Sequence, residues 1–204
     1  MFILGLTGSI GMGKSTAAQR FRDRGIPVCN ADDLVHALYE GEAVAPVEAA
    51  FPGVTCDGRI DRQKLSAALL ADPSGFKRLE AIVHPLVRKA QRDCLQAAQA
   101  CGAGIAILEV PLMLDHGGQD RVDAVIVVSA PAQLQRERVL ARPGMTPEKL
   151  DAILARQMPD EQKRKLADFV VDTGGTIEHT WAQVDTIIGQ IESRRATAFE
   201  RCWR

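Results

Sequence analysis

Aromatic residues and long hydrophobic runs are both scarce in this sequence. Only 4% of the residues are aromatic, which leaves little material for the stacking platforms that bind single-stranded nucleic acid. Because no run of about 18 apolar residues occurs, we expect no membrane-spanning helix. The apolar start of the chain has no basic segment before it and leads directly into a glycine-rich motif. We therefore do not interpret it as a signal peptide, and we expect a cytoplasmic protein.

An excess of charge of either sign is also absent. The chain has 204 residues, with 25 Lys and Arg against 26 Asp and Glu and a net charge of −1. A protein that wraps duplex nucleic acid would be clearly basic, so we expect neither nucleic acid nor a membrane as a partner. The 5 cysteines contain no C-x-x-C pair, and we expect reduced thiols rather than a zinc site or a disulfide framework.

Short apolar runs alternate with helical patterns along most of the chain. Runs of this kind are typical of buried strands, and they lie at residues 2–7, 26–29, 105–109, 125–129 and 169–172. Strands that alternate with helices favour a parallel sheet that is covered by helices on both faces. The predicted fold class is therefore α/β, with three layers and a five-stranded parallel sheet in a single domain over residues 1–204.

The stretch from about residue 34 to residue 102 differs, because it shows no strand signal. Asp61 has the character of a helix N-cap, and Asp72 followed by Pro73 has the character of another. His84 and Pro85 indicate the end of one helix and the start of the next. We expect a helical insertion here, which could hold a small acceptor molecule.

The clearest motif is a phosphate-binding loop that matches G-x-x-x-x-G-K-[ST], with an expected strand before it and a helix after it. The glycines let successive backbone N–H groups face an anion, and the N-terminus of the following helix faces the same phosphates. A lysine here suits the β- and γ-phosphates, and the next hydroxyl can ligate Mg²⁺. The sequence predicts a site for a nucleoside triphosphate and Mg²⁺ at Gly8, Gly11, Met12, Gly13, Lys14, Ser15 and Thr16.

Two classes of nucleotide-binding protein fit this loop. A GTP-dependent switch needs a guanine-reading N-K-x-D, and the sequence contains none. A small-molecule kinase needs a carboxylate near the loop, a region for the acceptor and a mobile lid with arginines. Asp32 follows the second expected strand, and the charged segment at about 133–166 is a candidate lid that contains Arg136, Arg138 and Arg142. A regulatory switch stays open as the alternative outside the enzymes.

The motifs, taken in their order, resemble those of the dephospho-coenzyme A kinase family. The resemblance is carried by residues 6–16, Ala31-Asp32, His84-Pro85-Leu86, Val110-Pro111-Leu112, Gln135 with Arg138 and Arg142, Arg156-Gln157, Ala167-Asp168 and Val171-Asp172. It covers nearly the whole chain. Three positions depart from the usual pattern: Asn30 and Asp115 replace Asp and Glu, and Thr173 replaces Asn.

This resemblance implies a P-loop kinase fold and an ATP- and Mg²⁺-dependent enzyme. The implied reaction is phosphorylation of the ribose 3′-hydroxyl of dephospho-CoA, the last step of coenzyme A biosynthesis, with no obligate protein partner. Another small acceptor, such as a nucleoside monophosphate or shikimate, is the alternative among kinases. The resemblance favours catalytic roles for Lys14, Asp32, Arg138 and Arg142, although Asp32 could instead cap the helix that follows it.

The remaining candidates concern the acceptor and the metal. The resemblance implies that His84, Arg88 and Pro111 contact the acceptor. Glu109 ends the third expected strand, where a carboxylate could reach Mg²⁺ through water. The run from Gln162 through Lys163 to Lys165 is typical of a solvated, basic helix end, so we assign it no role in the site.

Overall fold

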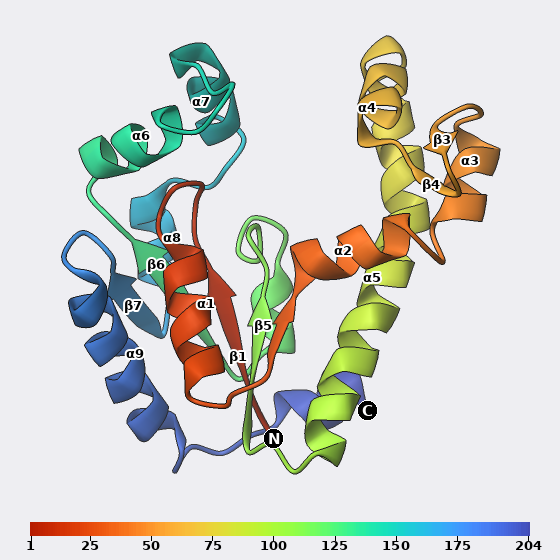
Figure 1. Ribbon diagram of the computed structural model, residues 1–204. Helices are drawn as coiled ribbons and strands as arrows, with labels where there is room; N and C mark the ends of the chain where they lie inside the picture. Colours follow the sequence, from red (N-terminus) through yellow and green to blue (C-terminus); the bar gives the residue numbers. More distant parts are fainter. The chain divides into compact units, whose positions relative to one another are not determined.

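The computed structural model describes residues 1–204 and consists of two compact units (Figure 1). The first unit contains residues 1–29 and 95–204, and the second contains residues 30–94. The phosphate-binding loop and the candidate lid belong to the first unit. The second unit overlaps most of the stretch, about residues 34–102, in which the sequence predicts a helical insertion.

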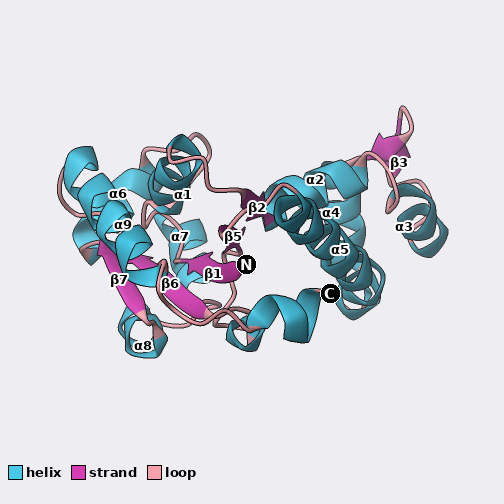
Figure 2. Ribbon diagram, turned by 90° about the horizontal axis from the view of Figure 1, so that it is seen from below, coloured by secondary structure: helices cyan, strands magenta, loops and turns pink.

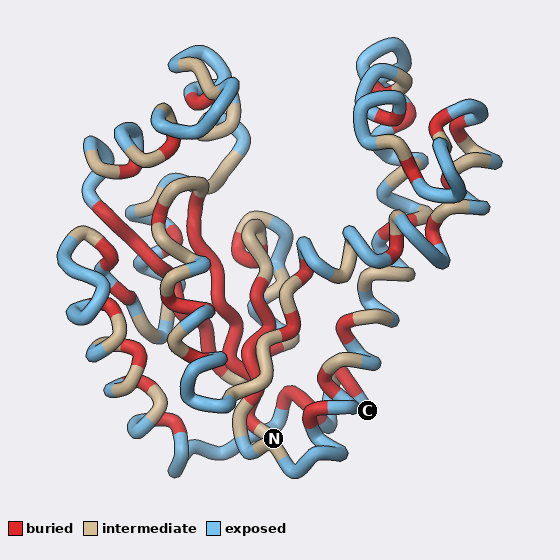
Figure 3. The backbone as a smooth tube through the Cα atoms, viewed as in Figure 1, coloured by how far each residue is buried: buried red, intermediate tan, exposed pale blue.

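A five-stranded sheet forms the centre of the first unit, in the order β2-β5-β1-β6-β7. Strand β1 pairs in parallel with β5 and β6, and β6 pairs in parallel with β7. Every residue of β1 and β6 is buried, which Figure 3 shows as red tube. This architecture confirms the predicted fold class. The strands are Phe2–Thr7, Val28–Asn30, Ile105–Glu109, Ala124–Ser129 and Phe169–Asp172.

Helices cover both faces of this sheet. Helices α1 (Lys14–Asp23) and α9 (Ile177–Ile191) lie on one face, and α8 (Asp160–Leu166) lies on the other (Figure 2). The buried side of α1 packs into the same hydrophobic core as β1 and β6, with Phe21 fully buried. The chain leaves α1 through Gly25, whose φ of 72° is the left-handed conformation common after a helix.

The first unit also contains the helices of the candidate lid and a docked C-terminus. The lid helices are α6 (Ala132–Leu140) and α7 (Pro147–Leu154). Two short helical segments outside the lid are the 3₁₀ helix η1 (Gly118–Arg121) and the π-helix η2 (Phe199–Trp203). In η2, the indole N–H of Trp203 donates to the backbone oxygen of Arg121 at 2.7 Å. No helix of the structure is both long and apolar enough to cross a membrane.

The second unit is mainly helical, as predicted, and has its own hydrophobic core around Val47, Phe51 and Leu65. It also contains a two-stranded hairpin that the sequence pattern missed, because each strand has only two residues. Its elements are α2 (Ala31–Tyr39), α3 (Val44–Ala50), β3 (Thr55–Cys56), β4 (Arg59–Ile60), α4 (Arg62–Ala71) and most of α5 (Gly75–Ala100).

The structure confirms one of the predicted helix boundaries in this unit and corrects two others. Asp61 caps α4 as predicted, since its carboxylate accepts hydrogen bonds from the N–H groups of residues 63 and 64. Asp72 instead ends α4, and α5 begins at Gly75. The predicted break at His84 and Pro85 is wrong, because α5 continues through Pro85. Proline removes only one hydrogen bond of the helical ladder, and a long helix keeps the others.

The prediction of five reduced cysteines is wrong for two of them. Cys56, Cys101 and Cys202 are free thiols. Cys29 and Cys94 are disulfide-bonded. The order and spacing of cysteines along a chain do not determine which sulfur atoms can bond, so composition alone could not separate these two from the others.

Candidate active site

The phosphate-binding loop lies between β1 and α1, as the motif predicts. Gly11 and Gly13 have φ values of 77° and 81°, and Gly13 is the residue immediately before α1. A Cβ atom at Gly13 would also lie 2.9 Å from Oγ1 of Thr173. Both the backbone conformation and this close approach therefore require glycine at that position.

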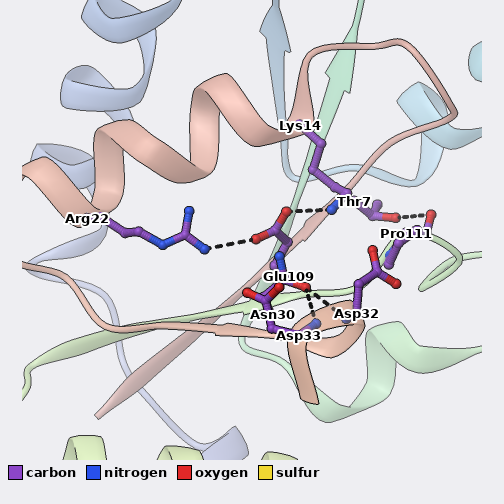
Figure 4. Close-up of polar contacts among 8 residues, drawn as sticks. All are labelled: Thr7, Lys14, Arg22, Asn30, Asp32, Asp33, Glu109 and Pro111. Atoms are coloured by element: carbon purple, nitrogen blue, oxygen red, sulfur yellow. Dashed lines mark hydrogen bonds and ion pairs between the residues drawn. The ribbon is translucent and has the colours of Figure 1, made fainter. Parts of the chain in front are cut away.

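The lysine of the loop is held by a carboxylate at the end of a strand. Nζ of Lys14 lies 2.5 Å from Oε1 of Glu109, and Nη2 of Arg22 lies 3.5 Å from Oε2 of the same residue (Figure 4). The side chains of Lys14 and Glu109 are 15% and 2% exposed. The predicted metal candidate Glu109 thus contacts two cations, and the pair fixes the position of the Lys14 ammonium.

A second contact connects the end of β1 with the segment after β5. The hydroxyl of Thr7 donates to the backbone oxygen of Pro111 at 2.9 Å (Figure 4). The predicted acceptor residue Pro111 therefore lies beside the residue that immediately precedes the loop, at the carboxyl edge of the sheet. Ligands of parallel α/β sheets bind outside this edge.

Two glutamines of the candidate lid segment hold the loop at Ile10. Nε2 of Gln135, on α6, donates to the backbone oxygen of Ile10 at 2.7 Å. The N–H group of Ile10 donates to Oε1 of Gln157 at 3.3 Å. Sequence reasoning used both glutamines to support the family resemblance but assigned them no place in the site. A polar side chain in a charged helical segment gives no signal of which backbone it will contact.

Lys163 corrects the prediction of a solvated, basic helix end. Its side chain is fully buried, 3.0 Å from Oδ2 of Asp115, and its Nζ donates to the hydroxyl of Ser9 in the loop at 3.2 Å. Its neighbours Arg164 and Lys165 are exposed as expected. The periodicity of α8 turns one residue of the charged run inward, and a run of like charges does not reveal which one.

The two predicted lid arginines have different surroundings. Nη2 of Arg138 donates to the backbone oxygen of Thr173 at 2.7 Å, and the hydroxyl of Thr173 donates to the backbone oxygen of Met12 at 2.8 Å. Arg138 is therefore connected to the loop through a single residue. Arg142 is exposed in the turn after α6. Arg136 forms an ion pair with Asp151 at 2.8 Å, which links α6 to α7.

The residue predicted to act as the base, Asp32, and two residues predicted to contact the acceptor, His84 and Arg88, belong to the second unit. Oδ1 of Asn30 accepts hydrogen bonds from the backbone N–H groups of Asp32 and Asp33, at 2.8 and 3.2 Å (Figure 4). Asn30 is thus the N-cap of α2, so the alternative that Asp32 caps this helix is wrong. Asp32 lies exposed in the first turn, and α2 begins three residues earlier than the expected boundary near residue 34. His84 and Arg88 are exposed one turn apart on α5.

Comparisons with known proteins agree with this arrangement. The sequence profile of the family described as Dephospho-CoA kinase matches residues 2–179. A relative from Mesorhizobium japonicum named Dephospho-CoA kinase is 55% identical over 97% of this chain and 100% of its own length. The chain belongs to the dephospho-CoA kinase family.

Solved structures show the same fold. The crystal structure of TT1252 from Thermus thermophilus has a TM-score of 0.80 at 34% identity, and it covers 93% of this chain and 97% of its own. Dephospho-CoA kinase from Campylobacter jejuni has a TM-score of 0.71 at 24% identity, over 93% and 96% of the two chains. At that identity, the second similarity supports the fold alone.

The three departures from the usual dephospho-CoA kinase pattern each have a local role here. Asn30 caps α2 through its side-chain oxygen. Asp115 accepts a hydrogen bond from the N–H group of Met158 at 2.6 Å and pairs with Lys163. Thr173 is buried and bridges Arg138 to the loop. In this member of the family, the replaced side chains still make polar contacts that hold the loop or a helix end.

Proposed function

We propose that this protein transfers the γ-phosphoryl group of ATP to the ribose 3′-hydroxyl of dephospho-CoA and so produces CoA and ADP. The observation that carries the proposal is the loop with Lys14 held at Glu109, in a chain whose length is nearly all covered by dephospho-CoA kinase relatives. This would be the last step of coenzyme A biosynthesis, in the cytoplasm.

The loop and Lys14 supply the phosphate-binding part of this mechanism. Backbone N–H groups and the N-terminus of α1 attract the phosphate oxygens, and the Lys14 ammonium neutralises charge on the β- and γ-phosphates. Phosphoryl transfer depends mainly on positioning and on electrostatic stabilisation, so groups that are fixed before the reaction contribute most. The Lys14–Glu109 contact supports a lysine that is fixed in this way.

Magnesium fits the loop as an ion bound jointly by the protein and the nucleotide. The Ser15 hydroxyl is exposed in the first turn of α1, whereas no cluster of three or more His, Cys, Asp or Glu side chains could hold a metal alone. We assign Ser15 as the ligand from the protein, and phosphate oxygens and water would supply the others. Bound Mg²⁺ neutralises phosphate charge. Glu109 would reach it through water, because Lys14 and Arg22 contact its oxygens.

Arg138 and Arg142 are the proposed cations of the lid. The Arg138–Thr173 contact beside the loop supports a role on the transferring phosphoryl group, and the exposed Arg142 would join it when the lid closes. Closure would also exclude water, which competes with the acceptor for the γ-phosphate. The lid proposed from the sequence spans about residues 133–166.

Asp32 is the proposed base for the acceptor hydroxyl. A carboxylate can accept a hydrogen bond from the hydroxyl of the acceptor and so align the hydroxyl oxygen for in-line attack on the γ-phosphate. Its exposure, and the use of Asn30 rather than Asp32 as the helix cap, are consistent with that role. We assign His84, Arg88 and Pro111 to binding of dephospho-CoA, on the basis of family membership.

A coupled ADP-release assay tests the proposal. ATP and Mg²⁺ are supplied with dephospho-CoA, with each nucleoside monophosphate or with shikimate, and the Lys14→Ala variant serves as the inactive control. ADP release only with dephospho-CoA is the expected result, together with CoA detected by mass spectrometry. Turnover with another acceptor would show a different small-molecule kinase. Slow hydrolysis that no acceptor accelerates would contradict a kinase function and favour a nucleotide switch.

A further inference from the structure

Lys163 is buried completely, although its side chain ends in an ammonium group. Nζ lies 3.2 Å from Oγ of Ser9, the second residue of the loop, and 3.0 Å from Oδ2 of Asp115. Oδ1 of Asp115 accepts the hydrogen bond of the Met158 N–H group at 2.6 Å. The cluster of Lys163, Asp115 and Ser9 therefore joins the loop to the segment after β5 and to the connection before α8.

Stability alone does not account for such a pair. Removing an ammonium and a carboxylate from water has a large free-energy cost for each ion, and apolar residues of similar volume are often equally stabilising. Lys165 shows the ordinary arrangement on the same helix, because its side chain is 70% exposed and pairs with Glu161. A buried charge is instead well suited to fix one arrangement of its neighbours, since any other arrangement leaves it unpaired.

Of the two polar contacts of the Lys163 ammonium, only the contact with the loop is a hydrogen bond. Oδ2 of Asp115 is close enough to Lys163 for an ion pair but has no hydrogen bond of acceptable geometry. The hydrogen bond of the ammonium goes to Ser9, which is itself buried. The next residue, Ile10, is held at its backbone oxygen and N–H group by Gln135 and Gln157.

We propose that Lys163 is a positioning residue for the phosphate-binding loop. Its ammonium holds Ser9, while Asp115 balances its charge and fixes the connection at Met158. The loop then has its phosphate-binding shape before the nucleotide arrives, which lowers the entropic cost of binding. The inference rests on the proposed function because it concerns the same loop, but it is independent of which acceptor is phosphorylated.

The double variant Lys163→Met with Asp115→Asn tests this role. It removes both charges, keeps nearly the same volume and retains an oxygen that can accept from Met158. Lys165→Met is the matched control, with the same substitution on the exposed side of α8. The measurements are the Kd of a non-hydrolysable ATP analogue by calorimetry, amide hydrogen exchange of residues 8–14 without nucleotide, and the Tm.

We expect the Kd of the double variant to rise about fivefold to tenfold, which lies within the range of coupling between residues in contact. Exchange in the loop should be faster, and the Tm should stay near that of the wild type. Ser9→Ala removes only the acceptor, so it should raise the Kd similarly and add little in the double-variant background. Lys165→Met should change neither Kd nor loop exchange.

A Kd and loop exchange equal to those of Lys165→Met would overturn the proposal. A lower Tm with an unchanged Kd would overturn it as well and leave Lys163 a structural role only. If the double variant does not fold, Ser9→Ala decides, because it keeps both charges: an unchanged Kd then refutes the role. Failure of the wild type to phosphorylate dephospho-CoA would refute the proposed function. It would not refute the positioning role of Lys163, because the Kd of the ATP analogue tests that role separately.

Discussion

Lys14, at the start of α1, and Glu109, at the end of β5, form an ion pair in which Nζ lies 2.5 Å from Oε1. Arg22 adds a second, longer contact to the same carboxylate. The residue that neutralises phosphate charge is thus placed by a side chain that is itself buried. Loss of Lys14 therefore affects both the chemistry and the stability of the loop.

Lys14→Ala should abolish turnover and lower the Tm while the protein remains folded. Removing one partner of a buried ion pair costs about 3–5 kcal/mol, and the cost here is reduced because Arg22 stays near Glu109. Adding Glu109→Gln to Lys14→Ala should restore much of the Tm without restoring turnover. Thermal unfolding by circular dichroism and the ADP-release rate measure the two effects. Turnover at the wild-type rate by Lys14→Ala would refute the assignment of the loop.

The moving part of the lid should lie between α6 and α8. Lys163 and the Ser129–Asp160 hydrogen bond of 2.6 Å hold α8 against the loop and the sheet. In hydrogen exchange, residues 141–156 should gain protection when a non-hydrolysable ATP analogue and dephospho-CoA are both present, whereas Gln157 and Met158 are already bound to Ile10 and Asp115. Residues 160–166 should already be protected in the free protein. Exchange that is identical with and without both ligands would remove the lid from the mechanism.

The sequence predicted the sheet and the loop well because both have strong local patterns. Each strand is a short apolar run, and the loop is a motif with fixed glycines and a fixed lysine. The boundary of α2 was predicted less well, because the capping residue Asn30 lies where the pattern suggested the end of a strand. A capping side chain acts on N–H groups two and three residues away, and this leaves little trace in hydrophobic periodicity.

The contacts that hold the loop from outside could not be predicted from local patterns. Gln135, Gln157 and Lys163 are distant from the loop in sequence, and each lies in a segment with many charged or polar residues. Their composition is typical of a solvated surface. Only the folded structure shows which of these side chains point inward.

The ion pair of Asp185 with Arg20 should give a small, acid-sensitive contribution to stability. The hydrogen bond from Arg20, 2.5 Å from Nη2 to Oδ2, lowers the pKa of Asp185 from its ordinary value of 3.8. A lowered pKa in the folded state stabilises the protein above the ordinary pKa, and the effect is lost as the pH falls through the lowered value. Both side chains are partly exposed, so the size of the effect is modest.

Asp185→Asn tests this contribution through the pH dependence of the Tm. The Tm difference from the wild type should be constant from neutral pH down to about pH 5 and should shrink in more acidic solution. A high salt concentration should reduce the difference at neutral pH, because the pair is accessible to solvent. A difference that stays the same at acidic pH would mean that packing, and not the charge of Asp185, accounts for it.

The pair of variants Asp32→Asn and Asp33→Asn tests the assignment of the base. A ribose hydroxyl is a weak nucleophile at neutral pH, and its proton must leave as the phosphoryl group arrives. Both aspartates lie in the first turn of α2 and donate their backbone N–H groups to Asn30, so either substitution leaves the helix cap in place. The two variants therefore differ in which carboxylate is lost and not in the helix that carries it.

Asp32→Asn should lower kcat by roughly 10²-fold or more, the usual effect of losing a general base. The affinity for ATP should change little, because the loop and Lys14 remain. Asp33→Asn should be much milder, since adjacent side chains on a helix point in different directions. The measurements are kcat for both variants and ATP binding by calorimetry. If Asp33→Asn is the inactive variant, the base is assigned one residue too early. If both variants turn over at the wild-type rate, the transfer proceeds without a carboxylate base from α2 and depends on positioning by the loop and its cations.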